Sequence, residues 1–243
     1  MAWNPGRAMQ DWGRLVETWQ ATLAAVERVG GYTTLEAARS ARISHSKVWG
    51  LVIENPASPV EIERTATSLG FALPPALDEI FGKCARSIHF RWQLPRSFEA
   101  PAPFDGIFCG GFSLSLTALQ AHEMSMREWV QGCFSNPDNP YDAVWHQKLA
   151  VIPIMNGDYI GIDLRAAHQG EVVYLSHDDG EGHGYVLGAD LIDFLRRWTP
   201  LGCPGPEDWQ WLPFTSGKAS MLEPDGDAAH AWRKTLGLTI PSK

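Results

Sequence analysis

The sequence lacks the features that mark several common classes of protein. Its four cysteines are far apart and form no Cys-x-x-Cys pair, which favours buried free thiols at Cys84, Cys109, Cys133 and Cys203 over disulfides or a zinc site. No apolar run approaches the roughly 18 residues of a membrane span. The N-terminal residues also lack the charged and then apolar order of a signal peptide. We therefore expect a cytoplasmic protein.

Established catalytic motifs are missing from the sequence as well. It contains no Gly-x-Ser-x-Gly elbow and no phosphate-binding loop. His122-Glu123 lacks the second histidine that a helical zinc site needs. We therefore assign no catalytic residue, no metal ligand and no cofactor from the sequence.

Basic residues are scarce in the middle of the chain. Residues 99–193 hold 3 basic and 14 acidic side chains, and the whole chain has a net charge of −8. Such a region repels nucleic acid and attracts a basic protein, whose encounter it accelerates by long-range steering. The alternative is a solvated acidic face that only aids solubility.

The segment from Val151 to Gly202 alternates strand and turn signals and ends in a helix. The predicted strands are residues 151–155, 160–164, 172–175 and 185–187, and Asn156-Gly157 is typical of a tight hairpin turn. Alternation within residues 160–164 predicts a sheet with one buried face. The helix at residues 189–198 has an apolar stripe at helical spacing, with Asp190 placed to cap its first turn.

Two further stretches carry clear signals. Residues 107–116 read as a strand, and a helix follows from Thr117. Val60 to Ile80 reads as an amphipathic helix with a Leu-Gly stop, followed by Leu-Pro before a second helix.

Together these elements resemble the SUKH superfamily, which includes bacterial toxin-immunity proteins and fungal cell-wall-synthesis regulators. The resemblance covers roughly Pro59 to Gly202, including the Ile-Gly-Ile-Asp-Leu and Gly-Glu-Val-Val-Tyr strands and the acidic loop after them. It implies an α+β fold with a mostly antiparallel sheet flanked by helices. The shared motifs are structural and transfer no catalytic role. The resemblance also implies binding to another protein, because members of this superfamily are generally understood as binding proteins.

Three segments follow from this division. Residues 1–57 form a helical extension, in which an apolar stripe from Met9 to Val26 marks a helix that ends at Gly30-Gly31. Residues 58–215 form the SUKH-like α+β domain, and residues 216–243 form a C-terminal tail.

Residues 33–71 offer an alternative, because they resemble a lactose-repressor-type helix-turn-helix. The chain would then be a DNA-binding regulator with the SUKH-like domain as its sensor or partner-binding part. However, Arg42 stands where that family usually has glycine, and the recognition helix from His45 to Ile53 offers only Lys47 as a firm cation. A segment with so little positive charge reads DNA poorly, so these helices are better suited to packing or dimerising.

The loop from His177 to Gly184 gathers histidines and carboxylates, which could ligate a metal or exchange protons. Their spacing matches no established metal motif, and a flexible Gly-Asp-rich connection between strands is the usual explanation. Eleven tryptophans are the other unusual feature. Trp12, Trp19 and Trp198 have core spacing, whereas Trp145, Trp209 and Trp211 lie in polar or turn-like surroundings.

The sequence thus predicts a non-enzymatic immunity protein that neutralises a cognate toxin by stoichiometric binding. The expected partner is a basic protein, with no nucleic acid and no membrane; the sequence leaves the oligomeric state open. The candidate partner-binding residues are Trp145, Asp158, Asp178, Asp179, Glu181, His183, Trp209 and Trp211.

Overall fold

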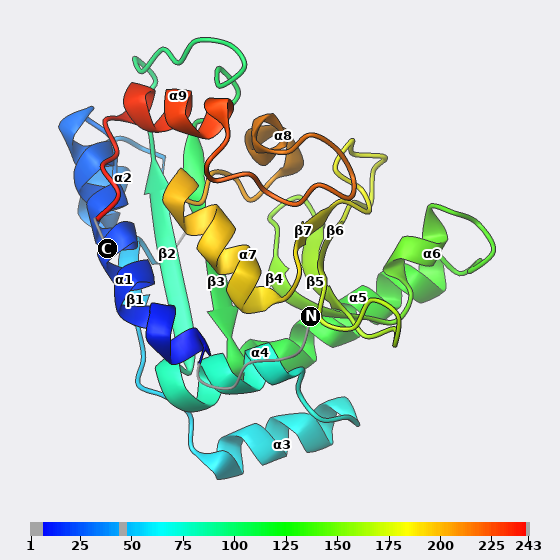
Figure 1. Cartoon of the computed structure of the whole chain (residues 1–243). Helices are drawn as coiled ribbons and strands as arrows, with labels where there is room; N and C mark the ends of the chain where they lie inside the picture. Colours follow the sequence, from blue (N-terminus) through cyan, green and yellow to red (C-terminus); the bar gives the residue numbers. More distant parts are fainter. Residues whose placement is uncertain (1–6, 44–47, 242–243) are drawn as a thin grey trace.

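The computed structural model describes residues 7–43 and 48–241, and within them the chain forms two antiparallel sheets flanked by helices (Figure 1). The first sheet has the order β1-β2-β3 and the second the order β4-β5-β6-β7. The predicted α+β class is confirmed. The strands are β1 (Gly50–Ile53), β2 (Ser87–Gln93), β3 (Cys109–Ser115), β4 (Lys148–Pro153), β5 (Tyr159–Asp163), β6 (Val172–Leu175) and β7 (Val186–Gly188).

The helices begin and end at residues that suit those places. Asp190 accepts a hydrogen bond from the N–H of Asp193 and caps α7, as predicted. Ser58 and Glu61 form a capping box at the start of α3, and Gly70 ends it in the left-handed region. The helices are α1 (Arg7–Arg28), α2 (Leu35–Ser40), α3 (Pro59–Leu69), α4 (Pro75–Glu79), α5 (Leu119–Gly132), α6 (Asp142–Trp145), α7 (Leu191–Trp198), α8 (Asp208–Trp211) and α9 (Asp227–Leu236). None of the helices in the described residues could span a membrane.

The first sheet has one covered face and one open face. Along β2, Ile88, Phe90 and Trp92 are buried, whereas the residues between them are partly exposed. The buried side chains meet α1, where the ring centroid of Trp19 lies 6.1 Å from that of Phe90. Figure 1 shows α1 and α7 on this side of the sheet.

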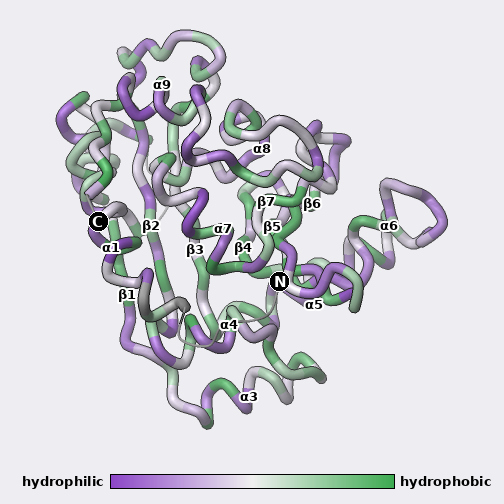
Figure 2. Tube along the Cα trace, in the orientation of Figure 1, coloured by the Kyte–Doolittle hydropathy of each residue, from purple (hydrophilic) through white to green (hydrophobic). Residues whose placement is uncertain are grey.

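The second sheet is buried on both faces, so the predicted single buried face is wrong. Residues of β4, β5 and β6 are almost all inaccessible to solvent, and hydrophobic residues predominate there in Figure 2. On one face Val173 and Leu175 pack with Met126 of α5 and Trp145 of α6. On the other face Ile160 and Ile162 join the main core.

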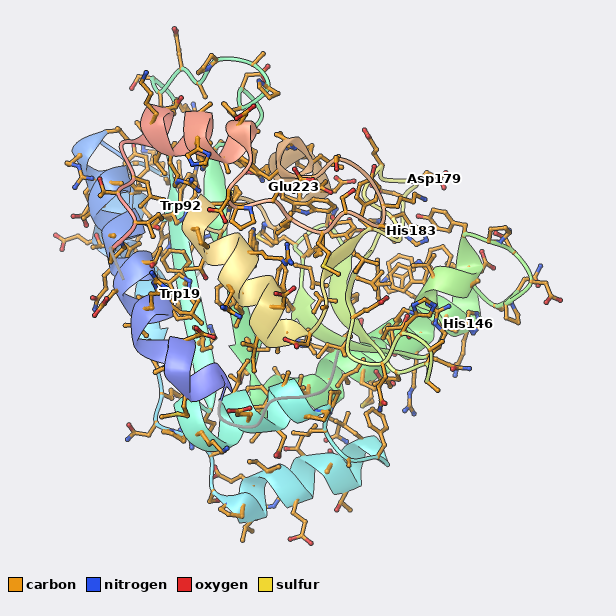
Figure 3. The ribbon with its side chains drawn as sticks, in the orientation of Figure 1. Trp19, Trp92, His146, Asp179, His183 and Glu223 are labelled. Carbon is orange, nitrogen blue, oxygen red and sulfur yellow. The ribbon has the colours of Figure 1, made fainter. Side chains whose placement is uncertain are left out.

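The segment from Thr199 to Pro204 collects hydrogen bonds from four buried indoles. The Nε1–H of Trp19 donates to Thr199 Oγ1 at 3.0 Å, and the other three donate to backbone carbonyls. Trp19 and Trp92 are labelled in Figure 3. These carbonyl bonds run from Trp92 to Gly202 at 2.7 Å, from Trp198 to Pro204 at 3.0 Å, and from Trp232 to Leu201 at 2.8 Å. Elements from both ends of the chain therefore meet at this segment.

The N-terminal residues and the tail share the main core. Trp19 and Val26 of α1, and Ala229 and Trp232 of α9, belong to one cluster with the strands of both sheets. The Arg28 guanidinium also donates to the Gly237 carbonyl at 2.9 Å.

The predicted helix-turn-helix is wrong. Residues 50–53 of the expected recognition helix form β1, which pairs antiparallel with β2 from Gly50 opposite Arg91 to Ile53 opposite Ile88. Residues 44–47 lie outside the described residues, and the expected first helix has only the six residues of α2. The β-branched and apolar Leu-Val-Ile run extends the sheet because β2 offers it a ladder, which local helix signals do not reveal.

The four cysteines are free. Cys84 and Cys203 are buried as expected, whereas Cys133 is exposed and Cys109 is half-buried. Burial raises the pKa of Cys84 and of Cys109 to about 11, so these two thiols stay protonated near neutral pH.

Candidate protein-binding surface

The loop that joins β6 to β7, residues 176–185, lies at one end of the second sheet, and Asp158 holds its beginning. The Asp158 carboxylate is buried, and its Oδ1 accepts hydrogen bonds from the backbone N–H of His177 at 2.8 Å and from His177 Nδ1 at 2.6 Å. Its Oδ2 accepts from Tyr174 Oη at 2.7 Å and from Asn156 Nδ2 at 2.8 Å. Every acceptor position of this buried carboxylate is therefore satisfied within the protein.

His183 closes the other end of the loop. Its Nδ1 accepts from the N–H of Ser176 at 3.0 Å, so Nε2 carries the proton and donates to the Tyr141 carbonyl at 3.0 Å. The Tyr141 ring stacks on the imidazole with centroids 3.7 Å apart. Burial lowers the pKa of His183, which keeps this neutral tautomer in place.

The Ser176 carbonyl gathers further donors from the α6 region. Tyr141 Oη donates to it at 2.6 Å and Trp145 Nε1 at 3.1 Å. Tyr141 Oη in turn accepts from the N–H of Asp179 at 3.0 Å. The turn before α6, which carries the exposed Asp138, is thereby fixed beside the loop.

Two glycines let the loop lie against α8. The Gly182 N–H donates to Asp208 Oδ2 at 2.8 Å, and a Cβ on Gly182 would come within 2.7 Å of the Trp211 ring. A Cβ on Gly180 would lie 2.7 Å from Ser176 Oγ. Both distances are too short for any side chain, so the sequence needs glycine at these positions.

The result is a fixed loop that presents carboxylates to solvent. Asp178, Asp179 and Glu181 are exposed, and Trp209, 48% exposed, follows the Asp208 anchor on α8. Figure 3 shows Asp179 near the outer edge of the molecule, with His183 beneath it. We call Asp178, Asp179, Glu181 and Trp209 the acidic loop surface.

The other four candidate residues are buried, so the prediction that they lie on the surface is wrong. Trp145 and Trp211 are at most 1% exposed, Asp158 is 2% exposed and His183 is 4% exposed. They hold the loop from beneath: Trp211 packs on Tyr174 with centroids 5.2 Å apart and donates to the Pro206 carbonyl at 3.2 Å. The structure thus brings the eight residues to one region, four as the surface and four as its support.

Asp158, His177 and Asp178 place ligand atoms within 4.8 Å of one another, which is close enough for a metal ion. Three observations argue against that use. Both Asp158 oxygens already accept two hydrogen bonds each, and His177 Nδ1 is directed at Asp158. Asp178 Oδ1 accepts from Ser176 Oγ at 2.9 Å. The groups serve the hydrogen bonds of the loop, and no metal site is assigned to them.

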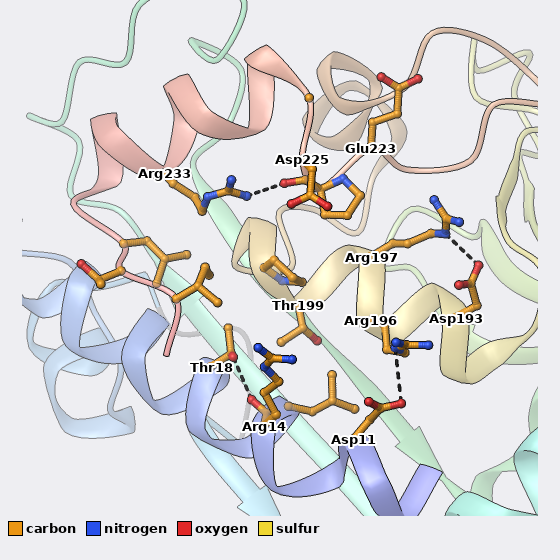
Figure 4. A pocket seen from close by; sticks show the side chains of 17 residues that line it. Asp11, Arg14, Thr18, Asp193, Arg196, Arg197, Thr199, Glu223, Asp225 and Arg233 are labelled. Carbon is orange, nitrogen blue, oxygen red and sulfur yellow. Dashed lines mark hydrogen bonds and ion pairs between the residues drawn. The ribbon is translucent and has the colours of Figure 1, made fainter. Parts of the chain in front are cut away.

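A separate cavity of about 1010 Å³ lies between α1, α7 and the segment that leads into α9 (Figure 4). Its charges are largely matched from within. Arg196 pairs with Asp11 at 3.3 Å, and Arg197 pairs with Asp193 at 2.7 Å. Arg233 donates to the Pro224 carbonyl at 2.5 Å. These pairs hold α1, α7 and the C-terminal segment together, which accounts for the charged lining.

The match to a known family covers the acidic loop and most of the residues that support it. Residues 56–197, more than half of the chain, match the model of the SMI1 / KNR4 family (SUKH-1). The chain belongs to this family. A comparison with curated proteins gave no match.

Two supports of the acidic loop surface lie outside the residues that match SUKH-1. Asp208 and Trp211 of α8 follow the matched region, and so does Trp209 of the surface itself. Sequence reasoning missed two supports, Tyr141 and Asp208. Tyr141 follows an Asn-Pro turn and Asp208 precedes a tryptophan, and neither context signals contact with a loop more than 20 residues away.

Proposed function

We propose that the protein is a non-enzymatic immunity protein that neutralises a cognate toxin by forming a stoichiometric complex in the cytoplasm. Membership of SUKH-1 supports a role in protein binding, because immunity proteins are a prominent group within the SUKH superfamily. The proposal further requires a surface on this chain that suits one partner. The acidic loop surface is our candidate.

One observation carries the proposal: exposed carboxylates stand on a loop whose backbone is held from both ends and from beneath. Asp179 N–H binds Tyr141 Oη, Gly180 N–H binds Ser176 Oγ at 3.0 Å, and Gly182 N–H binds Asp208. A surface that is fixed before contact loses less conformational entropy on binding. The same charges on a loose loop would give up part of their binding free energy to ordering.

The charge predicts the chemistry of the partner. Residues 99–193 carry 14 acidic and 3 basic side chains, and the exposed carboxylates of the loop belong to this excess. A basic protein would be steered toward the loop by long-range attraction, and Trp209 would supply the apolar area that charged contacts lack. We therefore expect a toxin with a positively charged surface, such as a nuclease domain that binds a polyanion.

The test is co-expression with the toxin encoded beside this gene, followed by titration calorimetry of the purified pair. The variant combines Asp178→Asn, Asp179→Asn and Glu181→Gln. The matched control combines Glu17→Gln, Glu63→Gln and Glu99→Gln, which removes the same charge from exposed positions elsewhere. We expect the loop variant to weaken binding by about 100-fold and to protect cells poorly, since such charges act through both steering and contact.

Equal affinity of the loop variant and the control would contradict the proposed surface. A toxin that is chemically altered with turnover, rather than held in a one-to-one complex, would contradict the proposed mode of action. Raised salt should slow association of the natural chain more than that of the loop variant, because screening shortens the range of the steering field.

A further inference from the structure

A second surface of opposite charge lies on the open face of the first sheet. Between β2, β3, the end of β4 and the segment before α8 is a groove of about 790 Å³. Arg91 lies on its floor, and the two residues opposite it in the ladder are Gly50 on β1 and Gly111 on β3. Neither neighbour has a side chain, so the sheet is hollowed around the guanidinium. We call this the sheet groove.

Both glycines are required by the backbone. Gly50 has φ +74° and Gly111 has φ +129°, conformations that other residues rarely adopt. A Cβ on Gly111 would also lie 2.0 Å from the Phe90 carbonyl oxygen. The hollow around Arg91 is therefore a fixed property of the sheet.

The positive charge of Arg91 has no ionic partner among the described residues. Its Nε is shielded from solvent and has no hydrogen-bond acceptor there, and its Cζ lies 5.1 Å from the centre of the Trp49 ring. Trp49 Nε1 is likewise buried without an acceptor in the described part of the chain. Buried donors without acceptors are rare, because each costs about 1–3 kcal/mol. Arg91 as a whole is only partly buried, so the rest of its guanidinium can donate to acceptor oxygens of an occupant.

Glu207, the acidic residue among the described groove lining, does not balance the guanidinium of Arg91. Glu207 lines the groove, but its Oε2 accepts from Gln210 Nε2 at 2.9 Å. Burial raises the pKa of Glu207 despite the opposing effects of Gln210 and Arg91. Among the described residues that line the groove, three arginines face this one carboxyl, so the groove has a net positive charge.

The rim adds two more cations and exposed apolar side chains. Arg42 and Arg96 line the groove and are exposed. Phe108, 47% exposed, and Met155, 73% exposed, line it as well. Arginines beside exposed apolar side chains suit an extended peptide that carries both carboxylates and hydrophobic side chains. A polyphosphate chain suits it less, because the chain as a whole has a net charge of −8 and repels long polyanions.

We propose that the sheet groove binds an acidic, extended peptide segment of a protein partner, with one carboxylate on Arg91 and apolar side chains on Phe108 and Met155. Arg presents a planar fork of donors that matches a carboxylate. This surface shares no residue with the acidic loop surface. The chain thus has one surface for a basic protein and another for an acidic segment.

The test uses the full chain and the acetylated, amidated peptide Glu-Leu-Asp-Phe-Glu-Leu, with Gln-Leu-Asn-Phe-Gln-Leu as its uncharged counterpart. Binding is measured by calorimetry and by the indole N–H signals in ¹⁵N–¹H spectra, with Trp49 assigned from Trp49→Phe. We expect the acidic peptide to shift the Trp49 signal and to bind at least about tenfold more tightly than the uncharged one, because a charged hydrogen bond carries the difference. The signal of Trp145, which lies outside the groove, should stay in place.

Three variants locate the site. Arg91→Gln should weaken the acidic peptide at least about tenfold, and the double rim variant Arg42→Gln with Arg96→Gln, which leaves the sheet intact, should weaken it by a smaller factor. Arg64→Gln removes an exposed arginine from α3 and should leave affinity unchanged. Removing the three carboxylates of the acidic loop should leave peptide binding in place, which separates this proposal from the immunity function.

Several results would overturn the assignment. One is equal binding of the two peptides, and another is unchanged affinity in both Arg91→Gln and the rim variant. Tighter binding of inorganic phosphate or of a single-stranded oligonucleotide would assign the groove to a phosphate ligand. A concentration-dependent dimer that Arg91→Gln abolishes and the peptide does not disrupt would assign it to a second copy of the chain.

Discussion

The two sheets of this protein have strands with the same alternating sequence pattern but bury different numbers of faces. In β2 the sequence Ser-Ile-His-Phe-Arg-Trp-Gln alternates, and its polar residues face the open side of the sheet. In β5 the sequence Tyr-Ile-Gly-Ile-Asp also alternates, yet all five residues are buried. The same pattern therefore accompanies an open face in one sheet and a covered face in the other. The two sheets differ in whether the charged residues on the strand have an ion-pair partner within the protein.

The charged residues show the difference most clearly. Asp163 at the end of β5 is fully buried and meets Lys148 Nζ at 3.1 Å, with Arg165 reaching the same carboxylate from the surface. Arg91 on β2 forms no ion pair with the described residues, and its guanidinium lies against the face of Trp49. In the second sheet charge is matched internally and stabilises the fold, whereas in the first sheet it remains available for recognition.

Lys148→Met should have the largest effect, because it leaves the Asp163 carboxylate inside the second sheet with Arg165 alone. Removing one partner of a buried pair costs about 3–5 kcal/mol of the free energy of unfolding. Urea denaturation followed by tryptophan fluorescence measures it. Replacing both residues, Lys148→Met with Asp163→Leu, should recover at least half of the loss. A single variant within about 1 kcal/mol of the natural chain would show that the pair is not sealed from water.

A matched pair of truncations compares the faces themselves. Ile162 on β5 is 1% exposed and Val52 on β1 is 44% exposed. We expect Ile162→Ala to lower the free energy of unfolding by about 3 kcal/mol, because it opens a cavity in a covered face. Val52→Ala should change it by no more than about 0.5 kcal/mol. A comparable loss for Val52→Ala would mean that the open face of the first sheet is covered in solution.

The exposed charges beside the first sheet should contribute little. Arg86 reaches Glu54 at 3.1 Å and Glu61 at 3.3 Å, and all three side chains are more than a third exposed. We expect Arg86→Gln to lower the free energy of unfolding by less than about 1 kcal/mol, since water screens these pairs. In 0.5 M sodium chloride the difference should nearly vanish. A loss that persists in high salt would place this pair with the buried one.

The smallest effect concerns acid stability. The backbone N–H and the hydroxyl of Ser58, with Arg86, lower the pKa of Glu61 to about 2. A carboxyl with a lowered pKa in the folded state stabilises the protein above about pH 4.5, and this contribution is lost as pH falls toward 2. Glu61→Gln should therefore show a shallower fall of melting temperature between pH 5 and pH 3 than the natural chain. Glu63→Gln, two residues beyond Glu61 on the same helix, should keep the original slope.

Local signals predicted much of the fold because the residues that carry them act over short distances. Asp190 caps α7 by accepting from a backbone N–H three residues away, and Gly70 ends α3 by adopting a left-handed backbone conformation. The hairpin at Asn156-Gly157 joins β4 to β5 as expected. These features follow from backbone conformations that the residues themselves favour.

The candidate site was predictable only in its exposed part. Asp178, Asp179 and Glu181 lie in a polar Gly-rich run, which a sequence shows directly. Trp145 has an equally polar setting in the sequence, but in the fold it is buried. Its ring stacks on that of Phe134, with centroids 4.7 Å apart, and its Nε1–H donates to the carbonyl of Ser176, 31 residues further along the chain. The prediction of a helix at residues 50–53 was wrong for the same reason, because these residues form a strand by pairing with β2. Contacts between residues far apart in the chain cannot be predicted from the residues that are adjacent in sequence.

The convergence of four indoles on residues 199–204 sets a limit on how this protein can be divided. Three of the donors, Trp19, Trp198 and Trp232, and all of the acceptors lie beyond residues 56–197, the region that defines the family. A fragment cut at those borders would uncover the side of the first sheet that α1 shields, and it would leave the buried indole of Trp92 without the Gly202 carbonyl that accepts its hydrogen bond. The family supplies a framework here, and the flanking segments of this particular chain complete it as a folding unit.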